Sequence, residues 1–451
     1  MFGFASVLCF LFGSLIFVKE MNIIRLTHFF SIKNVCNMSF SLYLFLIPGV
    51  FFLFCPLDRA ETILLYDENG AIKSVICSVA CYLTFNVGYV LIKREYIKTD
   101  YIRKVRETKL SSIFVLLSTI CFFLWARNFG GLDALLLNAG AIRSGFVNPD
   151  AQTAFFKHPV QLAKLSSLYI YVVILIRQNT YKSFREKMVL YVLEIISFGI
   201  SVLFLLADDS RSGMGLFFMS FVIVYLFKKT VIDRKSIGST TIRAVVCIAV
   251  VLFAILNGDI ILGTLRGTIE NNGNVDSTQN GIIDSIIHNF AYIVQSPFYA
   301  MYYVGEMNGK LLIWDDLITG ITAWLPSSIK PFPDAQRTWD VNTAIHCLHT
   351  PLYGQFPHSI VANSIYDLSY LGIIIIPCIL GMVVKKVENI MVPNLQNPFY
   401  LCIYCSLFIT FSNMIQGFCL YYIILNMFYL ILGLVIYLYM SKKVKIRIRR
   451  S

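Results

Sequence analysis

Long apolar segments alternate with short basic segments along the whole chain, and this alternation limits most strongly what the chain can fold into. A membrane-spanning helix needs about 20 apolar residues, and several segments approach that length. They are residues 2–18, 38–55, 74–92, 111–126, 159–176, 188–207, 213–227, 244–258, 359–384, 398–415 and 420–440. Only 14% of the residues are charged, against roughly 25% in a soluble domain. The sequence therefore predicts an all-α polytopic membrane protein with about 11 transmembrane helices and excludes a soluble enzyme.

Lysine and arginine are concentrated in every second connection between these segments. The six basic segments hold 27 of the 38 Lys and Arg and are residues 19–37, 93–109, 177–187, 228–243, 385–397 and 441–451. Cytoplasmic loops collect such residues, whereas translocated loops do not. We therefore expect a periplasmic N terminus, on a first helix that is retained, and a cytoplasmic C terminus. The net charge of +12 then reflects orientation in a membrane, and no nucleic-acid partner is expected.

The longest connection on the expected outer side is residues 259–358, between the eighth and ninth spans. A structureless connection of that length is uncommon in a compact protein, so we expect a large helical loop folded over the membrane. Residues 281–304 are apolar, but a crossing there would place the basic tail outside. We expect them to lie at the interface. This divides the chain into a bundle of spans 1–8 (residues 1–258), a periplasmic loop (259–358) and a bundle of spans 9–11 with the tail (359–451).

Three arginines stand beside small residues just outside predicted spans, on the side where positive charge is scarce. These are Arg143, Arg211 and Arg266. Arginine binds phosphate with two parallel hydrogen bonds, and the residues after Arg211 begin a helix, whose N-terminus favours anions. The three residues are candidates for a phosphate site. Each has a simpler interpretation, because Arg211 could pair with Asp208 or Asp209 and the others could anchor their segments at the interface.

Five of the six histidines also fall on the expected outer side. A metal site from His346, His349 and His358 is a possible reading of their spacing, but no cysteine or carboxylate completes a standard zinc pattern, so no metal is expected. His358 differs from the others because it precedes a span whose first turns carry Asn363, Ser364 and Asp367. Polar groups at that depth indicate a cavity rather than contact with lipid.

The layout of nearly the whole chain resembles the Wzy-type O-antigen polymerases, the oligosaccharide repeat-unit polymerases of the bacterial inner membrane. The resemblance rests on many spans, a short outer connection in which Arg211 stands between small residues (209–213), and one long outer loop late in the chain. A proline-bearing stretch (325–331) is followed by Asn342, and then by the segment 357–363, Pro-His-Ser-Ile-Val-Ala-Asn, with Gly372 further on.

The resemblance implies a glycosyltransferase that joins undecaprenyl-pyrophosphate-linked O-units at the periplasmic face of the inner membrane, in the biosynthesis of lipopolysaccharide. Membrane lipid is an implied partner, and a chain-length regulator protein is a further candidate. For this chemistry we expect the arginine trio to hold the pyrophosphate without a cofactor or metal. His358 is the first candidate for a general base, followed by Asp340 and Asp334, while Arg337 and Asn363 would contact the substrate.

Three other activities remain open from the sequence. An O-antigen ligase uses the same donor and has nearly the same layout. A flippase or other transporter of lipid-linked sugars should carry its charges within the spans, whereas this chain concentrates polarity in one outer loop. A membrane acyltransferase would be expected to place its histidine in a cytoplasmic or membrane-embedded motif, and His28 is the one histidine on the expected inner side.

Overall fold

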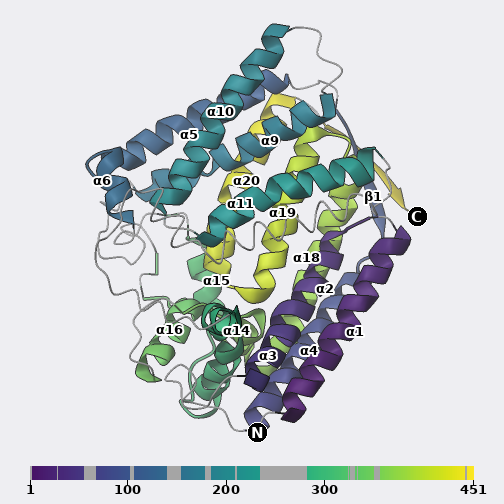
Figure 1. Cartoon of the computed structure of the whole chain (residues 1–451), viewed down its shortest axis with the longest axis vertical. Helices are drawn as coiled ribbons and strands as arrows, with labels where there is room; N and C mark the ends of the chain where they lie inside the picture. Colours follow the sequence, from purple (N-terminus) through teal and green to yellow (C-terminus); the bar gives the residue numbers. More distant parts are fainter. Residues whose placement is uncertain are drawn as a thin grey trace.

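The computed structural model describes most of the chain. The described residues are 3–27, 29–54, 68–101, 106–139, 154–177, 184–208, 211–233, 282–323, 325, 331–332, 334–349, 356–441 and 444–450. They form a helical bundle with one two-stranded sheet (Figure 1). The predicted span 244–258 and residues 259–281 of the predicted loop lie outside the described residues.

Ten described helical segments are long and apolar enough to cross a membrane. They are Gly3–Thr27, Ile32–Phe54, Asn69–Leu91, Glu107–Arg127, Lys157–Arg177, Phe184–Ala207, Gly213–Thr230, Ile360–Asn394, Pro398–Gln416 and Leu420–Ser441. Each overlaps one of the predicted spans, so the prediction of a helical, multi-pass membrane protein is confirmed.

In the first half of the chain, the elements are α1 (Gly3–Thr27), α2 (Ile32–Ser39), the π-helical turns η1 (Phe40–Leu46), α3 (Ile47–Phe54), α4 (Glu68–Leu91), β1 (Glu95–Tyr101), α5 (Glu107–Arg127), α6 (Leu132–Leu137), the short η3 (Ala154–Phe156), α8 (Lys157–Val160), α9 (Leu162–Arg177), α10 (Phe184–Ala207), α11 (Arg211–Phe227) and η4 (Lys228–Ile232). The second half comprises α14 (Ile282–Gly305), α15 (Ile313–Ile321), α16 (Thr338–His349), α17 (Ile360–Leu368), η6 (Ser369–Leu371), α18 (Gly372–Met391), η7 (Val392–Asn394), α19 (Pro398–Gln416), α20 (Leu420–Ser441) and β2 (Val444–Arg450).

Helices α4 and α18 make the most extensive helix–helix contact in the described structure. A Cβ atom added to Gly88 would lie 2.0 Å from the carbonyl oxygen of Cys378, and one added to Gly381 would lie 2.1 Å from that of Phe85. Small residues allow membrane helices to approach closely, and this approach replaces the hydrophobic driving force that lipid cannot supply. One glycine on each helix therefore fixes where α4 and α18 cross.

Buried polar residues connect α1, α2 and α4. The carboxylate of Glu20 is fully buried and accepts hydrogen bonds from the amides of Asn34 and Asn37, at 2.7 and 2.9 Å. Asn37 also shares amide hydrogen bonds with Asn86 of α4. Buried polar groups are stable only when they are hydrogen-bonded, so these contacts fix the register of the three helices.

The ninth predicted span is broken near its N-terminal end. α17 ends at Leu368, Ser369 has a φ of 56°, and α18 begins at Gly372. A Cβ atom on Gly372 would lie 1.8 Å from the carbonyl oxygen of Ser364, so only glycine fits there. The predicted segment 359–384 is therefore two helices, and α17 is a short separate helix with buried Asn363, Ser364 and Asp367.

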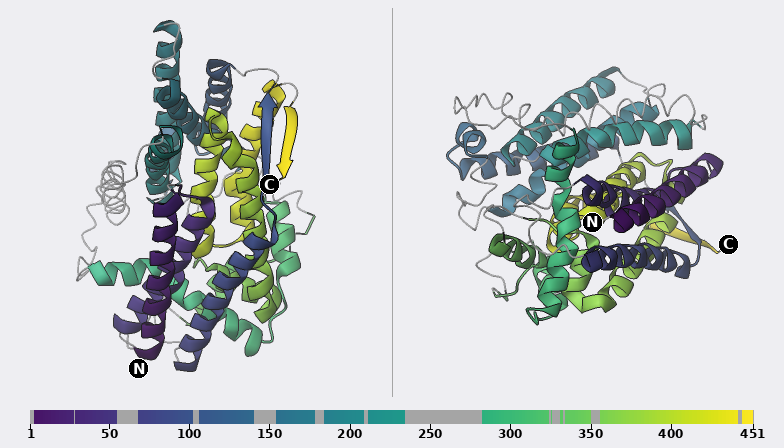
Figure 2. Two further views of the ribbon diagram at one scale, coloured as in Figure 1. Left: turned by 90° about the vertical axis from the view of Figure 1, so that its right-hand side faces the viewer. Right: turned by 60° about the horizontal axis from the view of Figure 1, so that its bottom comes forward.

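Helices α14, α15 and α16 gather at the end of the bundle where the N terminus lies, and the sheet lies toward the opposite end (Figure 1). α14 runs across the ends of other helices rather than beside α1 (Figure 2), and it contacts α3, α16 and α17. α15 exposes the apolar side chains Trp314, Leu317 and Ile321 and buries Asp316. This inverted amphipathic pattern suits a helix lying against lipid.

The sequence analysis missed the strands β1 and β2. They pair antiparallel, with Glu95 opposite Arg450 and Tyr101 opposite Val444. β1 follows α4 and β2 follows α20, so the pairing places two of the basic segments at the same end of the bundle. β2 alternates apolar and polar residues from Val444 to Arg449, which is the two-residue period of a strand, whereas β1 does not.

Candidate functional site

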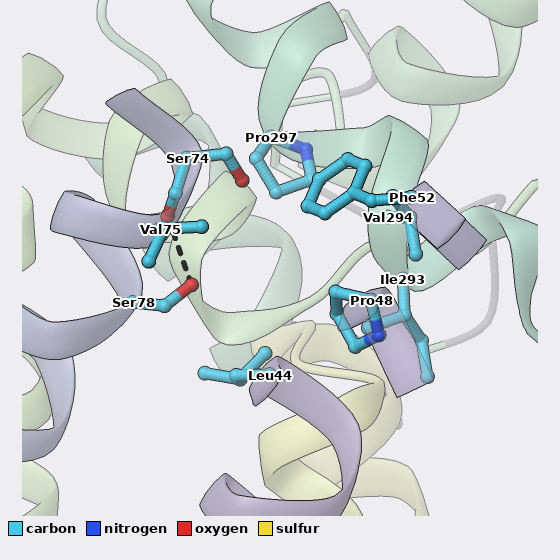
Figure 3. A pocket seen from close by; sticks show the side chains of 9 residues that line it. All are labelled: Leu44, Pro48, Phe52, Ser74, Val75, Ser78, Ile293, Val294 and Pro297. Atoms are coloured by element: carbon cyan, nitrogen blue, oxygen red, sulfur yellow. Dashed lines mark hydrogen bonds between the residues drawn. The ribbon is translucent and has the colours of Figure 1, made fainter. Parts of the chain in front are cut away.

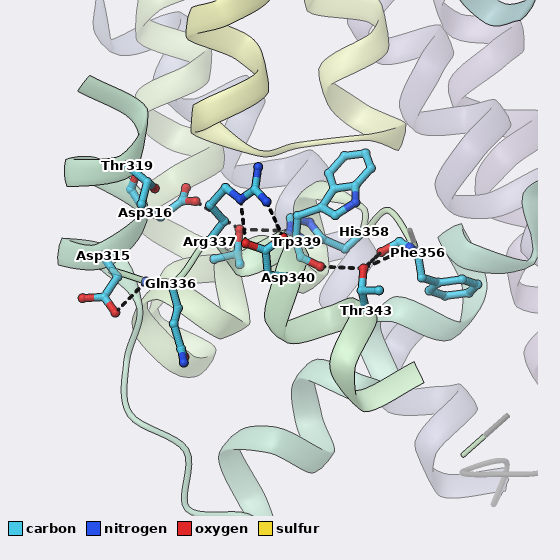
Figure 4. A network of polar contacts seen from close by, with 11 residues as sticks. Asp315, Asp316, Thr319, Gln336, Arg337, Trp339, Asp340, Thr343, Phe356 and His358 are labelled. Carbon is cyan, nitrogen blue, oxygen red and sulfur yellow. Dashed lines mark hydrogen bonds and ion pairs between the residues drawn. The ribbon is translucent and has the colours of Figure 1, made fainter. Parts of the chain in front are cut away.

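A buried polar network joins α15, α16, α17 and the beginning of α20. Figure 4 shows part of it, around Asp316, Arg337 and His358. Its members are Asp316, Thr338, His358, Asn363 and Asp367, and each is at most 2% exposed. The network lies where the short helix α17 enters the bundle. It brings together residues that are far apart in the sequence.

The hydroxyl group of Thr338 is the centre of this network. Its Oγ1 lies 2.9 Å from Oδ1 of Asn363, 3.2 Å from Oδ1 of Asp316 and 3.0 Å from Nε2 of His358. Asn363 is oriented by Asp367, because its Nδ2 donates to Oδ2 of Asp367 at 2.7 Å. The amide oxygen of Asn363 is thereby turned toward Thr338 as an acceptor.

These contacts favour a proton on Nε2 of His358. A hydroxyl has one proton to donate, and Thr338 directs it to the oxygens of Asn363 and Asp316. Nε2 of His358 must then donate to Thr338, so the other ring nitrogen, Nδ1, holds a free lone pair. Nδ1 is buried and has no hydrogen-bond partner among the described residues.

Burial keeps the imidazole of His358 neutral. The side chain is fully buried, and removal from water lowers the pKa of His358 to about 4, against the opposing effect of the backbone at Ser359 and at His358 itself. The neutral imidazole keeps a lone pair that can accept a hydrogen bond from a substrate hydroxyl, and the lowered pKa makes it a weaker base than a histidine in water. The position of His358 is fixed by its backbone as well, since its carbonyl accepts a hydrogen bond from the N–H of Phe418 at 3.1 Å.

The carboxyl group of Asp316 connects the network to α20. Its Oδ2 accepts from the backbone N–H of Leu420, the first residue of α20, at 3.4 Å. An acidic group is stabilised there by the unpaired N–H groups of the helix terminus. Burial nevertheless dominates and raises the pKa of Asp316, against the opposing effects of the Thr338 hydroxyl and the Leu420 N–H.

Aromatic side chains surround His358. The ring of Trp339 lies 5.9 Å from that of His358 and 4.6 Å from that of Tyr422, and the ring of Tyr366 lies 5.9 Å from His358 on another side. Nε1 of Trp339 is buried without a hydrogen-bond partner among the described residues, as is Oδ1 of Asp367. Three unpartnered buried polar atoms in one region leave hydrogen-bonding capacity for a ligand.

Arg337 precedes Thr338 and lies at the more exposed edge of the network. Its Nε and Nη2 donate to the two carboxylate oxygens of Asp340 at 2.6 and 2.7 Å. The guanidinium stacks over the ring of Tyr421, 4.8 Å from the ring centre. Its third nitrogen, Nη1, makes no hydrogen bond to a described residue, so Arg337 retains donors for another group. Asp340 is the more exposed partner, at 47% against 27% for Arg337.

The turn that carries His358 is supported from α16. Nδ2 of Asn342 donates to the carbonyl oxygens of Phe356 and Pro357, and Oδ1 of Asn342 accepts from the hydroxyl of Tyr366 at 3.0 Å. The ring of His346 stacks on Phe356 at 3.8 Å. Asn342, which the family resemblance singled out, therefore positions the backbone that precedes His358.

The other predicted site residues lie apart from this network or outside the described residues. Asp334 is exposed and makes no described contact with it. Arg143, Arg266 and the side chain of Arg211 lie outside the described residues, although the backbone of Arg211 begins α11. Asp208, considered as a partner of Arg211, forms an ion pair with Lys157.

The three histidines considered as metal ligands are not shown to share one centre. His346 faces the hydroxyl of Tyr299, with Nδ1 3.2 Å away, and His358 faces Thr338. The side chain of His349 lies outside the described residues. Within the described part of the chain, no three His, Cys, Asp or Glu side chains come together as metal ligands.

Thr338 and Asp316 were missed by the sequence analysis as site residues. A single threonine carries no motif, and neither does Asp316, which stands beside Asp315 in the sequence. Asp367 was recognised as a polar residue near the start of a span, and that depth in an apolar segment was the available signal. The pairing of Asp316 with Thr338 joins positions 22 residues apart, and no local pattern reveals it.

A small apolar hollow lies on the other side of α14 (Figure 3). It is lined by residues of η1 and α3, of α4 and of α14, namely Leu44, Pro48, Phe52, Ser74, Val75, Ser78, Ile293, Val294 and Pro297. The hydroxyl of Ser78 is directed to the backbone oxygen of Ser74 at 2.9 Å. Ser296 of the same helix α14 accepts instead from the backbone N–H of Ser359. α14 thus separates an apolar hollow from the polar network.

Comparisons with protein-family models, with curated proteins and with solved structures found no match to this chain.

Proposed function

We propose that this protein is an O-antigen polymerase, which joins undecaprenyl-pyrophosphate-linked oligosaccharide units at the periplasmic face of the bacterial inner membrane. The observation that carries the proposal is the buried network around Thr338 and His358, at the end of the bundle that the charge distribution assigns to the outside. It combines a neutral imidazole with buried polar atoms that have no partner. The layout of spans and motifs supports the proposal from the sequence.

The reaction transfers a glycan from its diphosphate to a sugar hydroxyl. The bond between the anomeric carbon and the diphosphate oxygen breaks, and a bond from that carbon to the acceptor oxygen forms. The acceptor proton passes to a base, and undecaprenyl pyrophosphate leaves. We assign the base to Nδ1 of His358, because Thr338 holds Nε2 as the donor.

The departing diphosphate needs positive charge. Arg337 supplies a guanidinium at the edge of the network, with Nη1 still able to donate. We propose that Arg143, Arg211 and Arg266 complete this charge, without a metal ion. The aromatic faces of Trp339 and Tyr422 are suited to sugar rings.

Deletion of the gene tests the proposal, and the readout is the lipopolysaccharide ladder on a gel. A polymerase predicts lipopolysaccharide capped by a single repeat unit. Complete loss of O-units would instead assign the protein as a ligase or a flippase. Complementation with His358→Ala should leave the single-unit product. The control is Asp334→Ala, which changes an exposed acidic residue outside the network. A ladder of normal length from His358→Ala would exclude the histidine as base.

A further inference from the structure

A second group of cationic side chains lies on one face of α8 and α9, outside the network described above. Lys157, Gln161 and Lys164 follow one another at spacings of four and three residues, which places them on the same helical face. Lys157 and Lys164 are separated by two turns, or about 10 Å along the helix axis at 1.5 Å per residue. The three residues, called here the lysine face, lead from the outer end of the span into the membrane.

Lys164 is the deeper of the two lysines and has no carboxylate partner among the described residues. Its Nζ donates to Oε1 of Gln161 at 3.0 Å and lies 5.6 and 5.3 Å from the ring centres of Phe204 and Tyr429. A neutral amide and two aromatic faces stabilise an ammonium group only partly. Charged residues within spans are costly and usually mark a functional site, and Lys164 retains donors for an anion.

Among the described residues, the lysine face forms one ion pair, and it lies at the outer end of this face. Lys157 pairs with Asp208, at the end of α10, and both side chains are about one-third exposed. His158, beside Lys157, packs against Phe428 of α20, and its Nδ1 is buried without a hydrogen-bond partner in the described structure. Two lysines therefore face one aspartate, which leaves excess positive charge on the side where basic residues are scarce.

α20 separates the lysine face from the network around Thr338. The helix packs against α8 and α9 and also against α15, and it lies between α9 and α15 in Figure 1. Tyr421, at its beginning, is within electrostatic reach of both Arg337 and Lys157. The two groups of polar residues are thus at the same end of the bundle but contact different sides of one helix.

We infer that the lysine face binds the phosphate of a lipid headgroup between α9, α10 and α20. Lysine binds phosphate as a point charge with rotatable donors, and lipid phosphates lie at the depth where the end of a span meets the membrane surface. The apolar surroundings of Lys164 suit a ligand with a hydrocarbon chain. This inference does not depend on glycosyl transfer. The phosphate could belong to a phospholipid or to a polyprenyl diphosphate, and the two sources are separable by experiment.

The experiment is a lipid-binding measurement on the purified full-length protein in detergent, by native mass spectrometry. The probes are undecaprenyl diphosphate, phosphatidylglycerol and, as a lipid without phosphate, diacylglycerol. The double variant Lys157→Gln with Lys164→Gln should bind at least one phosphate lipid about tenfold more weakly or worse, as expected for loss of charge-assisted hydrogen bonds. Its binding of diacylglycerol should be unchanged. Lys164→Arg should retain most of the affinity.

Lys187→Gln is the matched control, because Lys187 also lies over an aromatic ring, that of Tyr191 at 5.9 Å, but at the other end of α10. Weaker binding of undecaprenyl diphosphate alone assigns the site to the carrier lipid, and weaker binding of phosphatidylglycerol as well assigns it to phospholipids in general. Unchanged affinity of the double variant for both overturns the inference. If the double variant does not fold, the same lipid-binding measurement is made on Lys157→Gln alone. Lys157 lies at the outer rim of the lysine face, so this single change should not prevent folding.

Discussion

At the scale of single residues, Thr338 has one hydroxyl proton and three hydrogen-bond partners. It keeps Nε2 of His358 protonated, and it accepts and donates within a region closed to water. Removing its hydroxyl leaves buried groups of His358 and Asn363 without a partner, and an unpaired buried polar group costs about 1–3 kcal/mol. Thr338 therefore positions the histidine.

We expect Thr338→Val, which keeps the shape of the side chain, to lower the stability of the protein by about 1–3 kcal/mol. The O-antigen ladder should shorten as His358 loses its orientation. Thermal unfolding in detergent measures the first effect, and complementation of a deletion strain measures the second. The control is Thr322→Val, whose hydroxyl bonds only to Ile318 of its own helix. Equal behaviour of the two variants would contradict the role given to Thr338.

The pKa of His358 makes stability depend on pH. Its folded-state pKa is lowered from 6.5 to about 4 by burial, so the unfolded chain binds a proton more readily than the folded protein. The histidine's contribution, about 3 kcal/mol, is therefore present in full above pH 6.5 and is lost as the pH falls toward 4. The contribution of Asp316 to stability changes with pH in the opposite direction, because the pKa of Asp316 is raised in the folded protein.

His358→Gln should abolish this loss, because glutamine does not titrate. The measurement is thermal unfolding in detergent at several pH values between 4 and 7, with the wild type and the variant compared. The difference between their two stability curves isolates the contribution of His358, since Asp316 is present in both proteins. Parallel pH curves for the two proteins would show that His358 does not titrate as a buried neutral base.

The site was predictable only where a residue departed from its surroundings in the sequence. His358 and Asn363 were found because a polar cluster at the start of an apolar span is unusual. Asp340 was expected as a base, but in the structure it forms a bidentate pair with Arg337, a contact that depends on the helix start at Thr338. Thr338 could not be identified from the sequence, because its importance arises from the packing of four helices.

At the scale of the elements, α17 shows what periodicity and hydropathy do not reveal. The segment 359–384 has the hydropathy of one continuous span, yet the chain turns at Ser369 and restarts at Gly372. A break within a membrane segment is tolerated where the backbone is buried in protein, and α17 is covered by α14, α15 and α16. The short helix can then carry buried Asn363 and Asp367.

Gly372→Ala should disrupt this arrangement. The added Cβ would lie 1.8 Å from the carbonyl oxygen of Ser364, so α17 must move relative to α18. We expect a loss of about 1–3 kcal/mol in stability or more, together with loss of polymerisation. The control is Gly199→Ala in α10, where nothing lies within 4 Å of the added atom. That change should be neutral or slightly stabilising, since alanine favours a helix. Thermal unfolding in detergent compares the two, and a normal Gly372→Ala protein would show that the close contact is not required.

At the scale of the whole molecule, the hydropathy of the sequence was sufficient to locate ten of the predicted spans. Ten of the predicted segments coincide with described helices because length and apolarity are imposed by the bilayer itself. The pairing of β1 with β2 brings together two segments that the charge pattern places on one side. The contacts among α14 to α17 were not predictable, because they depend on individual polar side chains rather than on average hydropathy.

The charge pattern makes a further prediction, that α16 faces the periplasm. Cys347 of α16 is exposed, whereas the cysteines described within the spans are buried or partly buried. A maleimide that does not cross membranes should therefore label Cys347 in spheroplasts and not in inside-out vesicles. The variant Cys347→Ser measures the labelling of all other cysteines, and this background is subtracted. Labelling of Cys347 only in inside-out vesicles would place the network around Thr338 in the cytoplasm. The O-units of the proposed reaction, which are expected in the periplasm, would then be unable to reach the network, because a polar glycan does not cross the hydrocarbon core unaided.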